Sequence, residues 1–115
     1  LKNLDILEGG LLAHARGISD YFQSSLKRLE ELPLVGEVRG LGLMACVECV
    51  ADRVSNNPLT LDLEVGKRID RHCQELGLLV RPLIHMCVMS PPLTIDRAHI
   101  DRLLETLATA IRAVA

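Results

Sequence analysis

Arg81 is the one permanently charged side chain in an otherwise apolar and uncharged stretch, LLVRPLIHMCVMSPPLTI, which spans residues 78–95. A guanidinium keeps its proton at physiological pH, and burying it without a partner is strongly unfavourable, so Arg81 must reach water or an anion. Its planar fork of N–H donors matches a carboxylate in a bidentate geometry. The residue is therefore a candidate site for a ligand carboxylate. An internal salt bridge to an aspartate or glutamate of this chain fits the sequence equally well.

No other combination of residues predicts a catalytic centre. The sequence contains three lysines, which are Lys2, Lys27 and Lys67. Each falls at a chain end or on a solvated helix face, so none resembles the desolvated lysine of a Schiff base. Ser90 precedes two prolines and lacks the G-x-S-x-G turn that projects a nucleophile. Glu48, inside a predicted strand, is expected to face water, and Arg39 is expected to pack or to anchor a loop.

The cysteines and histidines do not indicate a metal site. Cys46 and Cys49 have the spacing of a zinc knuckle, but residues three apart on a strand point to opposite faces and no second pair follows. The other residues of these two types are Cys73, Cys87, His14, His72, His85 and His99. Because the cysteines lie inside apolar segments, we expect free core thiols and a reducing, cytoplasmic environment. The histidines are isolated in sequence, which favours surface or turn positions.

The composition narrows the class of partner. The formal charge is −2, from 13 basic and 15 acidic residues, and the only aromatic residues are Tyr21 and Phe22. A surface of this kind offers neither a basic stripe nor a stacking platform for nucleic acid. No uncharged stretch reaches the roughly 20 residues that a membrane-spanning helix requires. We therefore expect neither nucleic acid nor a membrane as partner.

The 115 residues have the length of a single domain, which we expect to span residues 1–115. The chain begins LKNLDILEGG, without methionine and without the pattern of a secretory signal. We expect it to be part of a longer polypeptide.

Three segments have the apolar spacing of amphipathic helices. The first runs from residue 4 to residue 29, with Gly9 and Gly10 predicting a break and Pro33 closing the segment. The second begins near residue 60 and ends at Gly77. Its expected inner face consists of Leu61, Val65, Ile69, Cys73 and Leu76. The third is capped by Thr94 or Asp96. Its expected inner face consists of Ile100, Leu103, Leu104, Leu107, Ile111 and Val114.

The strands are predicted between these helices. Residues 35–50 indicate one long strand buried on most of both faces, in which Gly40 and Gly42 mark a bend or a close approach. The segment ADRVSNNPLT then predicts a surface loop. Two short extended runs predict a hairpin that turns at Ile84 and His85. The order α-β-α-β-β-α predicts an α+β fold, with a small, mostly antiparallel sheet covered by helices on one face.

Three motifs together resemble the C-terminal small domain of class III pyridoxal-phosphate-dependent aminotransferases of fold type I. They are VGEVRGLGLMACVECV, LGLLVRPL and SPPLTI followed by an amphipathic helix. The most specific parts are the V-R-G-x-G-L-M run at residues 38–44 and an arginine ten residues before Pro91. Many members carry a Gly-Asp turn where this chain has Ile84 and His85, and they tend to have glycine at the position of Cys46 and an aliphatic residue at that of Cys49.

The resemblance implies a function for the complete polypeptide. In the omega-amino-acid, diamine and pyruvate transaminases of this family, the arginine matching Arg81 recognises the substrate carboxylate and swings aside for uncharged side chains. Pyridoxal phosphate, its lysine and the phosphate-binding loop belong to a preceding large domain that is absent from this chain, so this segment is expected to contain no catalytic, cofactor-binding or metal-binding residue. The implied reaction moves an amino group from an amine or omega-amino acid to a keto acid in a homodimer.

A second hypothesis remains open alongside this one. The chain could be a free-standing α+β regulatory or interaction domain that binds a small carboxylate through Arg81. Both hypotheses depend on Arg81 being directed at a ligand carboxylate.

Overall fold

The computed structural model describes residues 1–55, 57–58 and 63–115 and confirms the predicted α+β class. The helical elements are α1 (Lys2–Ile6), the π-helical turn η1 (Leu7–Leu11), α2 (Leu12–Lys27), the 3-10 turn η2 (Arg28–Glu31), α3 (Val65–Glu75) and α4 (Arg97–Val114). The strands are β1 (Val35–Leu41), β2 (Met44–Asp52), β3 (Asn57–Pro58), β4 (Arg81–Leu83) and β5 (Met86–Met89). They form an antiparallel sheet in the order β1-β2-β5-β4, and β3 pairs with β2.

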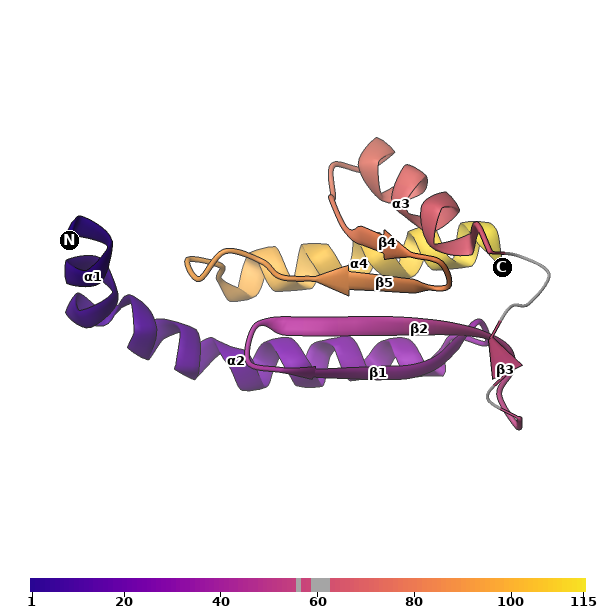
Figure 1. Cartoon of the computed structure of the whole chain (residues 1–115), viewed down its shortest axis with the longest axis horizontal. Helices are drawn as coiled ribbons and strands as arrows, with labels where there is room; N and C mark the ends of the chain where they lie inside the picture. The colour runs from indigo at the N-terminus through magenta and orange to yellow at the C-terminus, as the bar shows by residue number, and fades with distance from the viewer. Residues whose placement is uncertain (56, 59–62) are drawn as a thin grey trace.

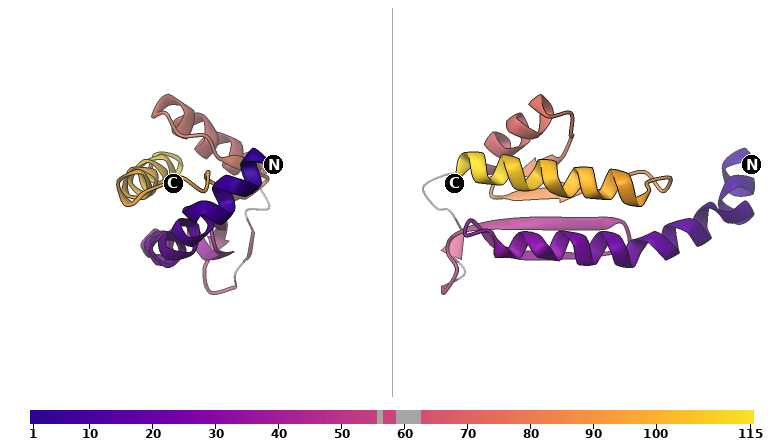
Figure 2. Two further views of the ribbon diagram at one scale, coloured as in Figure 1. Left: turned by 90° about the vertical axis from the view of Figure 1, so that its left-hand side faces the viewer. Right: turned by 180° about the vertical axis from the view of Figure 1, so that it is seen from behind.

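Helices cover one face of the sheet, as the sequence predicted. In Figure 1 the strands β1, β2 and β5 lie in front of α2 and α4, and in the right-hand view of Figure 2, from behind, these two helices come to the front. The burial of side chains alternates accordingly along the strands. Val38, Val47 and Cys87 pair across three strands and are at most 1% exposed. We call the opposite face, which carries the more exposed side chains, the open face of the sheet.

The segment predicted as one long strand is a hairpin of β1 and β2. Leu41 pairs with Met44, so the turn consists of Gly42 and Leu43, and Gly42 has a φ of 62°. A positive φ at the first central residue is what a type II′ hairpin turn requires, and glycine adopts it without steric cost. The long-strand prediction failed because apolar residues on both sides of the turn hid the break in the pattern.

The first helix is interrupted where the two glycines predicted a break. Gly10 has a φ of 133° inside the π-helical turn η1, so α1 departs from the direction of α2. Figure 1 shows α1 standing away from the rest of the molecule at the N-terminal end. Beyond the break, α2 buries Ala15, Ile18, Phe22 and Leu26. The helix gives way to extended backbone at Leu32, the residue before Pro33, because proline disfavours a helical residue in front of it.

The two later helices end as their capping residues dictate. The N-cap of α4 is Asp96, whose carboxylate accepts a hydrogen bond from the backbone N–H of His99 at 2.9 Å. At the end of α3, the N–H of Leu78 bonds the carbonyl of Cys73 and Gly77 has a φ of 86°, which is a Schellman ending. Leu76 was predicted to face inward but is 45% exposed, because it lies in this terminal turn. The predicted inner residue Leu61 lies outside the described residues.

The β4–β5 hairpin turns at Ile84 and His85, as predicted, because Leu83 pairs with Met86. Ile84 occupies the first central position with a φ of 56°, and it is the only described non-glycine residue with a positive φ. A β-branched side chain in this region is unusual and costs of the order of 1–2 kcal/mol. The turn therefore depends on contacts from its surroundings.

In the part of the chain that the structure describes, no helix is long and apolar enough to cross a membrane.

Candidate functional site on the open face

Arg81 is the first residue of the edge strand β4, and its side chain is exposed on the open face. It pairs with Val88 on β5, one residue away from the buried Cys87, so it points away from the helices. No carboxylate pairs with Arg81 among residues 1–55, 57–58 and 63–115. The open face carries two neighbouring rows across the four strands, namely Arg39, Cys46, Val88 and Arg81, and beside it Glu37, Glu48, Met86 and Leu83. Arg81 is thus a cation available to a ligand.

Three polar side chains on this face form a connected network that the sequence did not predict. Arg39 Nη1 donates to Glu48 Oε2 at 2.5 Å, and His85 Nε2 donates to Glu48 Oε1 at 2.9 Å. Arg39 also bonds Glu37 at 3.2 Å. The side chains of His85 and Glu48 are only 16% and 24% exposed. Glu48 was expected to face water alone; instead both of its oxygens are occupied.

The network changes the acidity of Glu48. Hydrogen bonds from Arg39 and then from His85 hold the pKa of Glu48 below its usual value of 4.5, and these outweigh the opposing effect of partial burial. Arg39, in turn, has a raised pKa because it donates to Glu48. Glu48 is therefore ionised throughout the neutral range and fixes the positions of both donors.

We expect acidification to destabilise this chain more steeply than its Glu48→Gln variant. A carboxyl group whose folded pKa lies below its unfolded pKa contributes stability that is complete above the unfolded value, here 4.5, and is lost as the pH falls through the folded value. Urea denaturation at neutral pH and near pH 3.5 would measure this. The loss of unfolding free energy between the two pH values should be smaller in Glu48→Gln, while the exposed-site control Glu105→Gln should behave like the wild type. Equal losses in all three proteins would contradict the assignment.

The four cysteines are free thiols, and three of them belong to the core as predicted. Cys49, Cys73 and Cys87 are fully buried, and burial raises the pKa of Cys49 to about 12 and that of Cys73 to about 11. Cys46 is partly exposed on the open face, and its pKa is also raised by burial. None of the four is an activated thiolate at neutral pH. Within the described residues, no group of three or more histidine, cysteine or acidic side chains could hold a metal ion.

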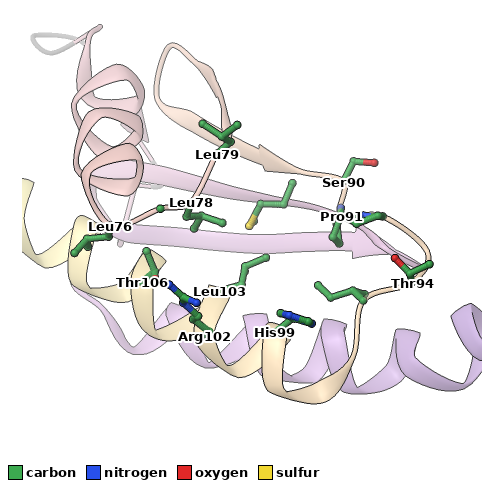
Figure 3. A pocket seen from close by; sticks show the side chains of 14 residues that line it. Leu76, Leu78, Leu79, Ser90, Pro91, Thr94, His99, Arg102, Leu103 and Thr106 are labelled. Atoms are coloured by element: carbon green, nitrogen blue, oxygen red, sulfur yellow. The ribbon is translucent and has the colours of Figure 1, made fainter.

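A cavity of about 480 Å³ opens on the helix side of the sheet, between the end of α3, the segment after β5, and α4. In Figure 3 its apolar walls include Leu78 and Leu103, and Arg102 and His99 reach it from α4. Met89, which lines this cavity, points to the covered face, whereas Arg81 points to the open face. The cavity and Arg81 therefore do not form one site.

Comparison with known proteins shows the family to which this chain belongs. The model of the family Aminotransferase class-III matches residues 1–111. The chain is 36% identical to the adenosylmethionine-8-amino-7-oxononanoate aminotransferase of Geobacter sulfurreducens, over 99% of this chain and 25% of that protein. This chain belongs to the class III aminotransferase family.

Solved structures agree with this assignment. An (S)-enantioselective omega-transaminase from Thermomicrobium roseum is 42% identical, with a TM-score of 0.91 over 98% of this chain and 25% of that one. A PLP-bound aminotransferase mutant from Vibrio fluvialis is 34% identical, with a TM-score of 0.89 over 96% of this chain and 24% of that one. The chain thus spans about a quarter of the length of the relatives it matches.

The lysines of this chain do not fit a covalent bond to the cofactor of that Vibrio fluvialis structure. The three lysines are exposed; Lys27 pairs with Glu30 at 2.9 Å and Lys67 with Glu64 at 3.1 Å, each one helical turn away, and Lys2 lies at the chain end. A lysine that bonds pyridoxal phosphate needs a desolvated pocket, and no lysine lines the described cavity. None of the three lysines is therefore a candidate for the covalent bond to that cofactor.

Proposed function

We propose that residues 1–115 are the C-terminal small domain of a pyridoxal-phosphate-dependent transaminase, and that Arg81 binds the carboxylate of its substrate. The complete polypeptide would move an amino group from an amine or omega-amino acid to a keto acid. The observation that carries this proposal is the position of Arg81 on the open face without a carboxylate partner among the described residues, in a chain of the class III family.

The geometry of Arg81 suits a substrate with a carboxylate. An exposed guanidinium on an edge strand offers its outer N–H donors in one plane, and a carboxylate can accept two of them at once. Because no acid among the described residues competes for these donors, a ligand carboxylate can bind Arg81 without breaking an ion pair within that part of the chain. The same exposure lets the side chain swing away when an uncharged substrate binds.

The remainder of the polypeptide supplies what this chain lacks. Leu41, Met44 and Leu79 are 86%, 62% and 80% exposed and lie at the end of the sheet where Arg81 lies. Large exposed apolar side chains that gather at one end favour coverage by another part of a protein. We infer that a large domain holding pyridoxal phosphate covers this end, and that the complete protein is a homodimer. The amino transfer itself would then be carried out outside this chain.

The test is amino transfer by the complete polypeptide that contains this chain. With pyridoxal phosphate and pyruvate, we expect alanine to form from at least one of 4-aminobutyrate, 1-phenylethylamine and putrescine, as measured by chromatography. No alanine from any of the three donors, by a protein that binds pyridoxal phosphate, would overturn the proposal. Calorimetric binding of butyrate or pyruvate by the 115 residues alone would instead favour the free-standing carboxylate-binding domain.

A further inference from the structure

We propose that Arg39, Glu48 and His85 form a positioning network that holds the β4–β5 hairpin, and with it the guanidinium of Arg81, in the place where a substrate carboxylate is bound. This inference rests on the function proposed above for Arg81. The three residues would not touch the substrate; they would act through the hairpin.

The hairpin turn requires external support. Its first central residue, Ile84, has a φ of 56°, where a two-residue turn normally has glycine. Strained backbone of this kind persists only when its surroundings hold it, and it is found preferentially at functional sites. The question is therefore which contacts hold this turn.

Two backbone hydrogen bonds hold the turn from opposite sides. The N–H of Gly66, in the first turn of α3, donates to the carbonyl of Ile84 at 2.8 Å, and the N–H of Cys49 on β2 donates to the carbonyl of His85 at 2.9 Å. Gly66 permits this approach because a Cβ there would lie 2.7 Å from the Ile84 oxygen. Figure 1 shows the β4–β5 turn between the start of α3 and the far end of β2.

The side-chain network adds the third contact and ties the turn to two further strands. His85 bonds Glu48 on β2, and Glu48 bonds Arg39 on β1, so the turn is connected to the opposite edge of the sheet. Hydrogen bonds to an ionised carboxylate are stronger than neutral ones, and partial burial of His85 and Glu48 reduces their screening by water. Arg39 also contacts the sulfur of Met86, the residue that follows the turn, at 3.7 Å.

The position of the turn determines the position of Arg81. Within the described residues, β4 consists of three residues, pairs with β5 alone and packs against α3, so the hairpin is one of its two supports. Arg81 lies three residues before Ile84 and points to the same open face as the network. Recognition of a carboxylate by two parallel hydrogen bonds is sensitive to displacements of about 1 Å. Loosening the turn should therefore weaken carboxylate binding without affecting uncharged substrates.

The experiment compares two donors of the complete transaminase, with pyruvate as acceptor. 4-Aminobutyrate carries a carboxylate where butylamine carries a methyl group. Because transfer proceeds in two half-reactions, kcat/KM for the donor reports on the donor's half alone. For His85→Leu, which removes the hydrogen bond to Glu48, we expect kcat/KM to fall about tenfold for 4-aminobutyrate and to stay within about twofold for butylamine. His85→Gln, which keeps a donor, should restore most of the loss. The matched control His72→Leu, on α3, should change neither.

A double mutant separates this inference from the proposed function. If the network acts through Arg81, His85→Leu should have no further effect on 4-aminobutyrate in an Arg81→Ala background. If Arg81→Ala changes kcat/KM equally for 4-aminobutyrate and butylamine, the proposed function fails. The positioning network alone is wrong in two cases. In the first, Arg81→Ala lowers kcat/KM selectively for 4-aminobutyrate but His85→Leu does not. In the second, the losses from the two substitutions add in the double mutant.

A second measurement, on the complete polypeptide, needs no activity. Amide hydrogen exchange at Cys49 and Gly66 should be faster in His85→Leu than in His72→Leu, because both amides donate to the turn. Unchanged exchange at both amides would also overturn the positioning role.

Discussion

Arg81→Ala is expected to lower kcat/KM for 4-aminobutyrate by about 100-fold in the complete transaminase while changing kcat/KM for butylamine by less than about threefold. A bidentate pair between guanidinium and carboxylate is among the stronger hydrogen-bonded contacts in proteins, and Arg81 has no partner among the described residues that would need to be rearranged. Removing the guanidinium should therefore abolish binding of the carboxylate and leave the reaction of the uncharged donor almost unchanged. Initial rates at varied donor concentration and fixed, saturating pyruvate would measure both values.

Two control variants separate the effect of the positive charge from that of the guanidinium geometry and of the position of the arginine. Arg81→Lys keeps the charge but loses the planar fork, so it should fall between the wild type and Arg81→Ala. Arg112→Ala removes an exposed arginine at the end of α4 and should leave both donors unaffected. A loss of the same size for both donors in Arg81→Ala would show that Arg81 supports the fold of the site and does not recognise the carboxylate.

Gly40→Ala is expected to destabilise the 115-residue chain by about 3 kcal/mol, since overpacking that moves backbone is costly. A Cβ at position 40 would overlap the carbonyl oxygen of Met44 and lie 2.8 Å from the Cα of Ala45 and 2.9 Å from Gln23 Oε1. Two of these three atoms belong to the backbone of the partner strand. The β1–β2 hairpin would have to open or shift on α2 to make room.

Gly17→Ala is the matched control for this substitution. Gly17 lies within α2 and has no positive φ, and beyond its own helix backbone no atom lies within 4 Å of a Cβ built there. Alanine favours the helix, so this variant should gain about 0.5–1 kcal/mol. Urea denaturation followed by circular dichroism would measure both variants. Equal stability of Gly40→Ala and the wild type would show that β1 and β2 can separate at little cost.

Periodicity and capping residues predicted the elements whose apolar pattern is uninterrupted. The inner face of α4, a cap at Thr94 or Asp96, a break at Gly9 and Gly10 and the turn at Ile84 and His85 were all predictable, because each depends on a few neighbouring residues. The β1–β2 hairpin was not readable, because apolar residues continue through its turn. The helical position of Leu76 was misjudged for a similar reason: its spacing fits the inner face, but the ending at Gly77 rotates it outward.

The site was predicted only in part. Arg81 could be singled out because it interrupts an apolar run, and its exposure and lack of a described partner agree with a ligand-directed role, which itself stays a prediction. The contacts of Arg39, Glu48 and His85 could not be predicted, because they depend on strand register. Arg39 and Glu48 become close only when the chain reverses at Gly42, and His85 joins them only through the pairing of β2 with β5. A hairpin predicted within residues 35–50 would have brought Arg39 close to Glu48.

The short edge strand β4 has a consequence for solubility. Pro82, its central residue, has no N–H group, and a three-residue edge interrupted by proline is a poor template for pairing with another polypeptide. The opposite edge, β1, is seven residues long and carries no proline. If copies of this chain join their sheets edge to edge, they should pair through β1. Because β4 is a poor edge for further pairing, such assembly should stop at two copies.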